Sequence, residues 1–422
     1  MPEVKTPDIR GINLNEPALF RLDNGIPVYI IDSGKQDLIR LELIFNAGYY
    51  VQSAPLQALT SGMMMKEGTS NYSSKEIAET VDHYGTYFET LIDQDTSCLC
   101  LYSLFKNLEK VLPVIEEVVR NPVFPEEELS IFIAKNKQQF IIHSKKVEYQ
   151  AKVNFNSNIF GYNHPYGKKA DLKDFDLLNR DQIVDFYRTN YSSSNCKIFI
   201  SGKSATDTLS LLNTHFGGDH WNVNYNTNHN AIRQNPVTEK KQFIHKEDAL
   251  QSAVRIGKPL FNKLHPDYSG LKILMTILGG YFGSRLMTNI REEKGYTYGI
   301  GSGMVSLLNG GYMFISTETG IEHTSNTLKE IYYELDKLRE EIVSPEELDL
   351  VKNYMLGEML HNFDGPFDQA DRYRSVVDYG LDFKYYRKSI DDIQKIEPYD
   401  LKQLAEKYLD PDSFYEVIAG KL

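Results

Sequence analysis

The chain has 422 residues, of which 41% are hydrophobic and 25% charged, and its formal net charge at pH 7 is -12. Its length suits two domains of ~200 residues each. The negative charge and the scattered lysine pairs argue against a nucleic-acid partner, since proteins that bind a phosphate backbone usually carry a basic stripe.

Targeting signals are not evident at the start of the chain. Residues 1–17 contain no apolar signal core, and the apolar run at residues 271–278 is too short to span a bilayer. We therefore expect no membrane insertion and a cytoplasmic location, or a periplasmic one if a leader has been removed. Cys98 and Cys100 stand two apart on a predicted strand, so they point to one face and are expected to be free thiols.

Local periodicity indicates both strands and long helices. Alternating apolar residues predict strands at residues 26–32, 39–48 and 96–105. Helical spacing predicts helices at residues 73–85, 107–120 and 328–341. Strands and helices that mix without strict alternation favour an α+β fold, in which helices pack on a largely antiparallel sheet.

Two pairs of segments resemble each other at nearly the same offset along the chain. Residues 124–140 and 343–360 both begin with a proline and a run of Glu, as helices do at their N-termini. Residues 178–203 and 393–421 both contain an amphipathic helix, a turn and a strand that ends in Gly-Lys. The repetition predicts two tandem homologous domains.

The domain boundary is predicted between these copies. The segment after residue 215 is rich in Asn and Gly and shows no periodicity, which is typical of a linker. We predict an N-terminal domain at residues 1–215, a linker at 216–240 and a C-terminal domain at 241–422.

The segment "GGYFGSRLMTNIREEKGYTYG", residues 279–299, combines five glycines with charged and aromatic side chains. A short helical run carries Arg285 and Arg291, and the segment ends with Tyr296 and Tyr298. We expect Gly295 to end this helix, so that the chain turns into a strand that carries Tyr298.

Four stretches give the chain a family resemblance. They are "FRLDNGIPVYIID", "KEGTSNYSS", "NPVFPEEEL" and the segment at residues 279–299. Together they resemble the insulinase/pitrilysin family of inverted-motif zinc peptidases, of the short mitochondrial-processing-peptidase-like type, over nearly the whole chain. The resemblance implies a clamshell of two copies of one α+β domain, with peptides cut in a chamber that paired subunits enclose.

The metal motif of that family is missing here. Alignment on Gly68-Thr69 places "LTSGM" where the family has H-x-x-E-H, so Leu59 and Met63 replace the two histidines and Gly62 replaces the glutamate. The helix within residues 129–146 offers Lys and Gln where the family has acidic residues. The chain is therefore predicted to hold no zinc and to use no other cofactor.

Two further features of the sequence argue against a metal site and against a peptide-docking strand in the first half. His215 and His220 flank the start of the predicted linker and are expected to be loop histidines rather than metal ligands. Glu89 and Thr90 replace the small polar pair of the family's peptide-docking strand.

The second half keeps the residues that the resemblance assigns to substrate. An Arg and a Tyr seven positions apart face the zinc in the family, and Arg291 and Tyr298 have that spacing. A guanidinium can hold a substrate carbonyl, and a phenol can donate to the oxygen that becomes negative. The competing interpretation is a solvated helix face and a core tyrosine. Arg285 is predicted to be structural.

These features favour a non-catalytic subunit of a heterodimeric zinc peptidase. Such a pseudoenzyme would be inactive alone, and it would lend Arg291 and Tyr298 to a homologous catalytic subunit that carries H-x-x-E-H, the zinc and the bound peptide substrate. The alternative is a structural or chaperone-like scaffold of the same fold. An autonomous peptidase with other ligands is disfavoured.

Overall fold

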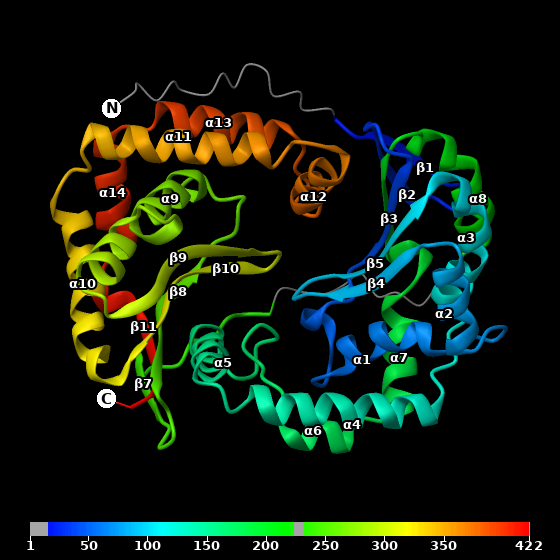
Figure 1. Cartoon of the computed structure of the whole chain (residues 1–422), viewed down its shortest axis with the longest axis horizontal. Helices are drawn as coiled ribbons and strands as arrows, with labels where there is room; N and C mark the ends of the chain where they lie inside the picture. Colours follow the sequence, from blue (N-terminus) through cyan, green and yellow to red (C-terminus); the bar gives the residue numbers. More distant parts are fainter. Residues whose placement is uncertain (1–15, 223–231, 422) are drawn as a thin grey trace.

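The computed structural model describes residues 16–222 and 232–421. Two β-sheets lie on opposite sides of the molecule, each with helices on its outer face (Figure 1). This arrangement confirms the predicted α+β fold of two similar halves. Within the residues described, no helix is long and apolar enough to cross a membrane.

The first sheet has the strand order β1-β2-β6-β3-β5-β4. Its neighbouring strands are antiparallel except for β2 and β6, which are parallel. The three strands predicted in this half correspond to β2, β3 and β5. The strand bounds are β1 Ala18–Arg21, β2 Pro27–Asp32, β3 Leu38–Phe45, β4 Tyr87–Ile92, β5 Ser97–Leu104 and β6 Cys196–Gly202.

The second sheet repeats this topology. Its order β7-β11-β8-β10-β9 matches β2-β6-β3-β5-β4, and the parallel pair β7 and β11 corresponds to β2 and β6. The duplicated sequence pattern therefore corresponds to a duplicated strand order. The bounds are β7 Lys241–His245, β8 Gln251–Leu260, β9 Thr297–Leu307, β10 Gly310–Gly320 and β11 Tyr415–Gly420.

Three helices of the first half, α2, α6 and α7, begin after a capping box. The helix predicted at 73–85 is α2, which begins after a capping box formed by Ser73 and Glu76. The bounds are α1 Gln57–Met64, α2 Ser74–His83, α3 Phe105–Arg120, α4 Glu126–His143, α5 Val147–Phe160, α6 Leu172–Leu177, α7 Arg180–Asn190 and α8 Leu209–Phe216.

Helices of the second half follow the same plan, with two π-helical segments added. Helix α11 opens on Pro345 behind the cap Ser344, as α4 opens behind Pro125. The π-helical segments are Thr276–Gly280 and Met287–Glu293. The α-helices are α9 Tyr268–Met275, α10 Thr324–Glu340, α11 Pro345–His361, α12 Pro366–Val377, α13 Lys384–Lys395 and α14 Pro398–Tyr408.

Helix α5 packs on the sheet of the other half (Figure 1). Its Phe155 and Phe160 share a buried cluster with Tyr312 of β10 and Val417 of β11. These apolar contacts attach the first half of the chain to the second sheet.

Helix α12 makes the reciprocal contact with the first sheet (Figure 1). Tyr373 and Val377 pack on a cluster that contains Ile44, Cys98 and Phe199. The two halves thus exchange equivalent helices, and each half completes a core of the other. As predicted, Cys98 is a buried free thiol, and so is Cys100.

A charged network also joins α12 to the first sheet. The Arg40 guanidinium lies 2.8 Å from Asp371 and 3.1 Å from Glu42, and Arg374 lies 3.0 Å from Glu42. Glu42 is only 2% exposed, so its charge is neutralised by the two arginines rather than by water. Burial opposes the charge of Arg40, but Glu42 and Asp371 outweigh it and raise the pKa of Arg40 above its ordinary value.

The predicted linker 216–240 lies between α8 and β7. Helix α8 ends at Phe216, and β7 begins at Lys241. Part of this linker, residues 223–231, lies outside the described residues. The proposed boundaries of the two domains stay a prediction, because the exchanged helices mean that no single cut separates the two cores.

Candidate functional site

The structure brings Arg291 and Tyr298 together on the second half. Arg291 lies near the end of the π-helical segment Met287–Glu293, and Tyr298 lies at the start of the edge strand β9. The Arg291 Nε donates to the Tyr298 carbonyl oxygen at 2.9 Å. The guanidinium carbon also lies 4.6 Å from the centre of the Phe282 ring and 5.9 Å from that of Tyr298.

Two aromatic rings therefore hold the Arg291 cation in place. The sequence interpretation missed Phe282, although an aromatic residue among three glycines was a usable signal. Phe282 is 63% exposed and Tyr298 is 91% exposed. The interpretation of Tyr298 as a core residue is thus wrong, because its ring lies on the surface.

The backbone between Arg291 and Tyr298 fixes where these two residues lie. Gly295 has φ of +65°, in the left-handed region that favours glycine, so the chain leaves the helix and enters β9 at Thr297, as predicted. The Thr297 hydroxyl donates to the Glu318 carbonyl at 2.5 Å and anchors the start of the strand to β10. Tyr298 is fixed at its backbone, while its phenol has no partner among the described residues.

Arg285 has a different role from Arg291. Its Nε and Nη2 donate to the two carboxylate oxygens of Glu347 at 2.8 and 2.7 Å. This bidentate pair attaches the segment to α11. The pair supports the prediction that Arg285 is structural.

The positions that would hold zinc lie on α1. Leu59 and Met63 are half-buried and offer no oxygen or imidazole nitrogen. A Cβ added to Gly62 would lie 2.8 Å from the Tyr191 hydroxyl and 3.1 Å from Ile92. The Tyr191 hydroxyl is itself fixed, because it donates to Ser97 Oγ at 2.7 Å. Close packing therefore fills the space that the family's glutamate would need.

Neighbouring elements supply no replacement ligand. Helix α4, which packs against α1, has no acidic residue after its first turn. His215 lies in the last turn of α8, so the prediction of a loop histidine is wrong for it, because the helix extends to Phe216. It binds Glu116 at 2.8 Å, and His220 binds Ser193 at 2.9 Å, so the two histidines have separate partners. Across residues 16–222 and 232–421, no three His, Cys, Asp or Glu side chains are grouped to hold a metal. These side chains do not fit a zinc ion.

The edge strand β4 carries Glu89 and Thr90 where the family has a small polar pair. Glu89 accepts a hydrogen bond from the Tyr87 phenol at 2.9 Å, and Thr90 is buried. A carboxylate on an edge strand disfavours the addition of another strand. The substitution noted in the sequence thus coincides with a charged sheet edge.

We expect the purified chain to hold far less than one zinc per molecule. The same result is expected after Leu59→His, Gly62→Glu and Met63→His are made together, because the two histidines would be the only ligands and α4 adds no third. Elemental analysis after dialysis measures this directly. Stoichiometric zinc that a chelator removes would contradict the prediction.

Family models match both halves of the chain. The model described as insulinase (peptidase family M16) matches residues 61–156. The model described as the peptidase M16 inactive domain matches residues 177–355.

Relatives and solved structures agree with these matches. An uncharacterized zinc protease of Rickettsia felis is 24% identical over 357 residues, which cover 81% of this chain and 82% of the relative. A Helicobacter pylori protein described as a non-peptidase homolog is 20% identical over 377 residues, with 85% and 83% covered.

The crystal structure of a peptidase M16 inactive domain from Pseudomonas fluorescens has a TM-score of 0.86 to this chain at 24% identity, with 96% of this chain and 98% of the other covered. A Helicobacter pylori protease has a TM-score of 0.85 at 17% identity, with 96% and 100% covered. Both share the two-domain architecture described above. The chain therefore belongs to the insulinase (M16) family of peptidases.

Proposed function

We propose that this protein is a non-catalytic subunit of a zinc peptidase, and that it supplies Arg291 and Tyr298 to the active site of a homologous partner. The observation that carries the proposal is the contrast between the two halves. The second half presents an exposed Tyr298 whose backbone is bonded to the half-buried Arg291, while the first half has Leu59 and Met63 at the positions of the metal ligands.

The unused polar atoms of this pair define its chemistry. The Arg291 Nε donates to a backbone carbonyl, and the two terminal nitrogens of this side chain have no partner among the described residues. Those nitrogens suit a peptide carbonyl oxygen. The free phenol of Tyr298 suits the oxygen that gains negative charge when that carbonyl is attacked, and one such donor contributes roughly 3 kcal/mol.

A second subunit is needed because binding and polarising a carbonyl does not activate water. The α1 helix of this chain has no residue for that task at positions 59, 62 and 63. A homologous subunit with H-x-x-E-H would bring the zinc, the general base and an intact peptide-docking strand. Peptide substrates would then be held between the two chains.

A scaffold without any role in proteolysis is the second candidate. The Helicobacter pylori relative described as a non-peptidase homolog favours it. A scaffold, however, has no need for an exposed tyrosine whose backbone is fixed by an arginine. The two functions differ in whether Arg291 affects peptide cleavage.

Co-expression with an H-x-x-E-H homologue from the same genome tests the proposal. We expect the two chains to co-purify and to cleave unfolded peptides only together. Arg291→Ala should raise KM about tenfold or more, because a charge-assisted hydrogen bond to the peptide is lost, while the partner's zinc content stays unchanged.

The matched control is Arg387→Ala, which removes an exposed arginine from α13. It should leave KM unchanged. If the complex forms but Arg291→Ala cleaves peptides like the wild type, the scaffold function is supported and the proposed one is refuted.

A further inference from the structure

A small pocket lies among four helices of the second half. Lys272 of α9, Glu358 of α11, Arg372 of α12 and Tyr386 of α13 all line it. Its cavity volume is about 90 Å³. One water needs ~10–15 Å³ on this measure, so the pocket has room for about six waters or for a molecule of amino-acid size.

Positive charge in this pocket lacks direct partners. The Lys272 ammonium makes no hydrogen bond or ion pair with any described residue. One terminal nitrogen of Arg372 donates to Asn362 Oδ1 at 2.8 Å, but its Nε is buried without a partner. The two cations therefore have unused donors.

A third cation lies close enough to repel the other two. The pKa of Lys263 is lowered to about 8, first by burial and then by the positive charges of Lys272 and Arg372. The Lys272 side chain is itself solvent-exposed, and its charge interacts with that of the nearby Glu358. Crowded cations that lack a direct counter-ion are typical of anion-binding sites.

A negative charge borders the same pocket. The Glu358 carboxylate influences Lys272 but lies beyond ion-pair distance of it, and it makes no hydrogen bond with the described residues. Met355, Met359 and Phe363 supply an apolar wall. The pocket thus presents separated positive and negative groups next to an apolar surface.

We infer that this pocket binds a free α-amino acid with an apolar side chain. The carboxylate would bind Lys272 and Arg372, and the ammonium would bind Glu358. The side chain would pack on Met355 and Met359. This ligand matches both charges at once, whereas a simple anion would bring its own charge close to Glu358. The inference is independent of the proposed partner subunit.

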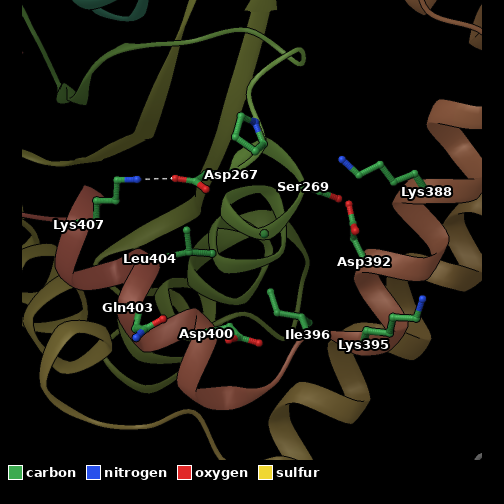
Figure 2. A pocket seen from close by; sticks show the side chains of 12 residues that line it. Asp267, Ser269, Lys388, Asp392, Lys395, Ile396, Asp400, Gln403, Leu404 and Lys407 are labelled. Carbon is green, nitrogen blue, oxygen red and sulfur yellow. Dashed lines mark hydrogen bonds and ion pairs between the residues drawn. The ribbon is translucent and has the colours of Figure 1, made fainter.

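A neighbouring groove between α9, α13 and α14 provides a comparison (Figure 2). Figure 2 shows Lys407 pointing toward Asp267 and Lys395 extending from α13. The Lys407 Nζ lies 2.7 Å from the Asp267 carboxylate. Lys395 also pairs with Asp391 at 3.5 Å. This groove is open, and these lysines already have acidic partners. Lys395 is therefore a matched control for Lys272.

Calorimetric titration of the full chain with L-leucine and L-methionine tests the inference. Both should bind, whereas 4-methylpentanoate, which lacks the ammonium, and isoamylamine, which lacks the carboxylate, should bind about ten- to hundredfold more weakly. If neither amino acid binds at millimolar concentration, the inference is refuted. Equal binding of leucine and 4-methylpentanoate would show a simple anion site and would also refute it.

Variants locate the binding. Lys272→Met should weaken leucine binding about tenfold or more, and Glu358→Gln should weaken leucine but not 4-methylpentanoate. Lys395→Met should change neither. Both Lys272 and Glu358 have solvent-accessible side chains, so an unchanged unfolding midpoint is expected and verifies that each variant folds. Leucine binding that survives Lys272→Met would place the ligand elsewhere.

Discussion

In a complex reconstituted with the zinc-bearing partner, Tyr298→Phe is expected to lower kcat about a hundredfold. The substitution keeps the ring that packs with Arg291 and removes only the phenol hydroxyl. That hydroxyl has no partner in the described residues, so the fold should not change. If it donates to the developing oxyanion, its loss should affect the chemical step more than peptide binding.

Single-turnover cleavage of a fluorogenic peptide measures this step. Tyr87→Phe is the matched control, because Tyr87 is another exposed tyrosine on an edge strand, but of the first sheet. It should cleave at the wild-type rate. Unchanged cleavage by Tyr298→Phe in an intact complex would remove Tyr298 from the mechanism.

Loss of the buried charge at Glu42 is expected to destabilise the fold by about 3–5 kcal/mol. Glu42→Gln keeps the shape of the side chain but leaves Arg40 and Arg374 without their shared carboxylate beneath α12. Removing one member of a buried ion pair exposes the remaining charge to a poorly solvating interior. Chemical denaturation followed by circular dichroism measures the free energy of unfolding.

Glu89→Gln is the control for this change, because Glu89 lies on the edge strand β4 and is less buried. It should change stability by no more than about 0.5 kcal/mol. A Glu42→Gln effect equally small would show that water reaches the network and that α12 docks by its apolar contacts alone.

The sequence by itself determined the elements and their repetition. The alternation at residues 26–32 and the helical spacing at residues 73–85 are local signals, so they predicted β2 and α2 correctly. The missing zinc motif at Leu59, Gly62 and Met63 was also evident, because ligands and a general base depend on residue identity. The segment at 279–299 indicated Gly295 as a helix end for the same local reason.

Only the tertiary structure decided which sheet each helix covers. The apolar residues of α5 and α12 predict burial, but periodicity does not specify the surface that buries them, and both helices pack on the other half. The sequence also could not show that a side chain at position 62 has no room, because the group that blocks it, the Tyr191 hydroxyl, is distant along the chain. The pocket that contains Lys272 and Glu358 could not be predicted either, because these residues line one cavity only after four helices have packed together.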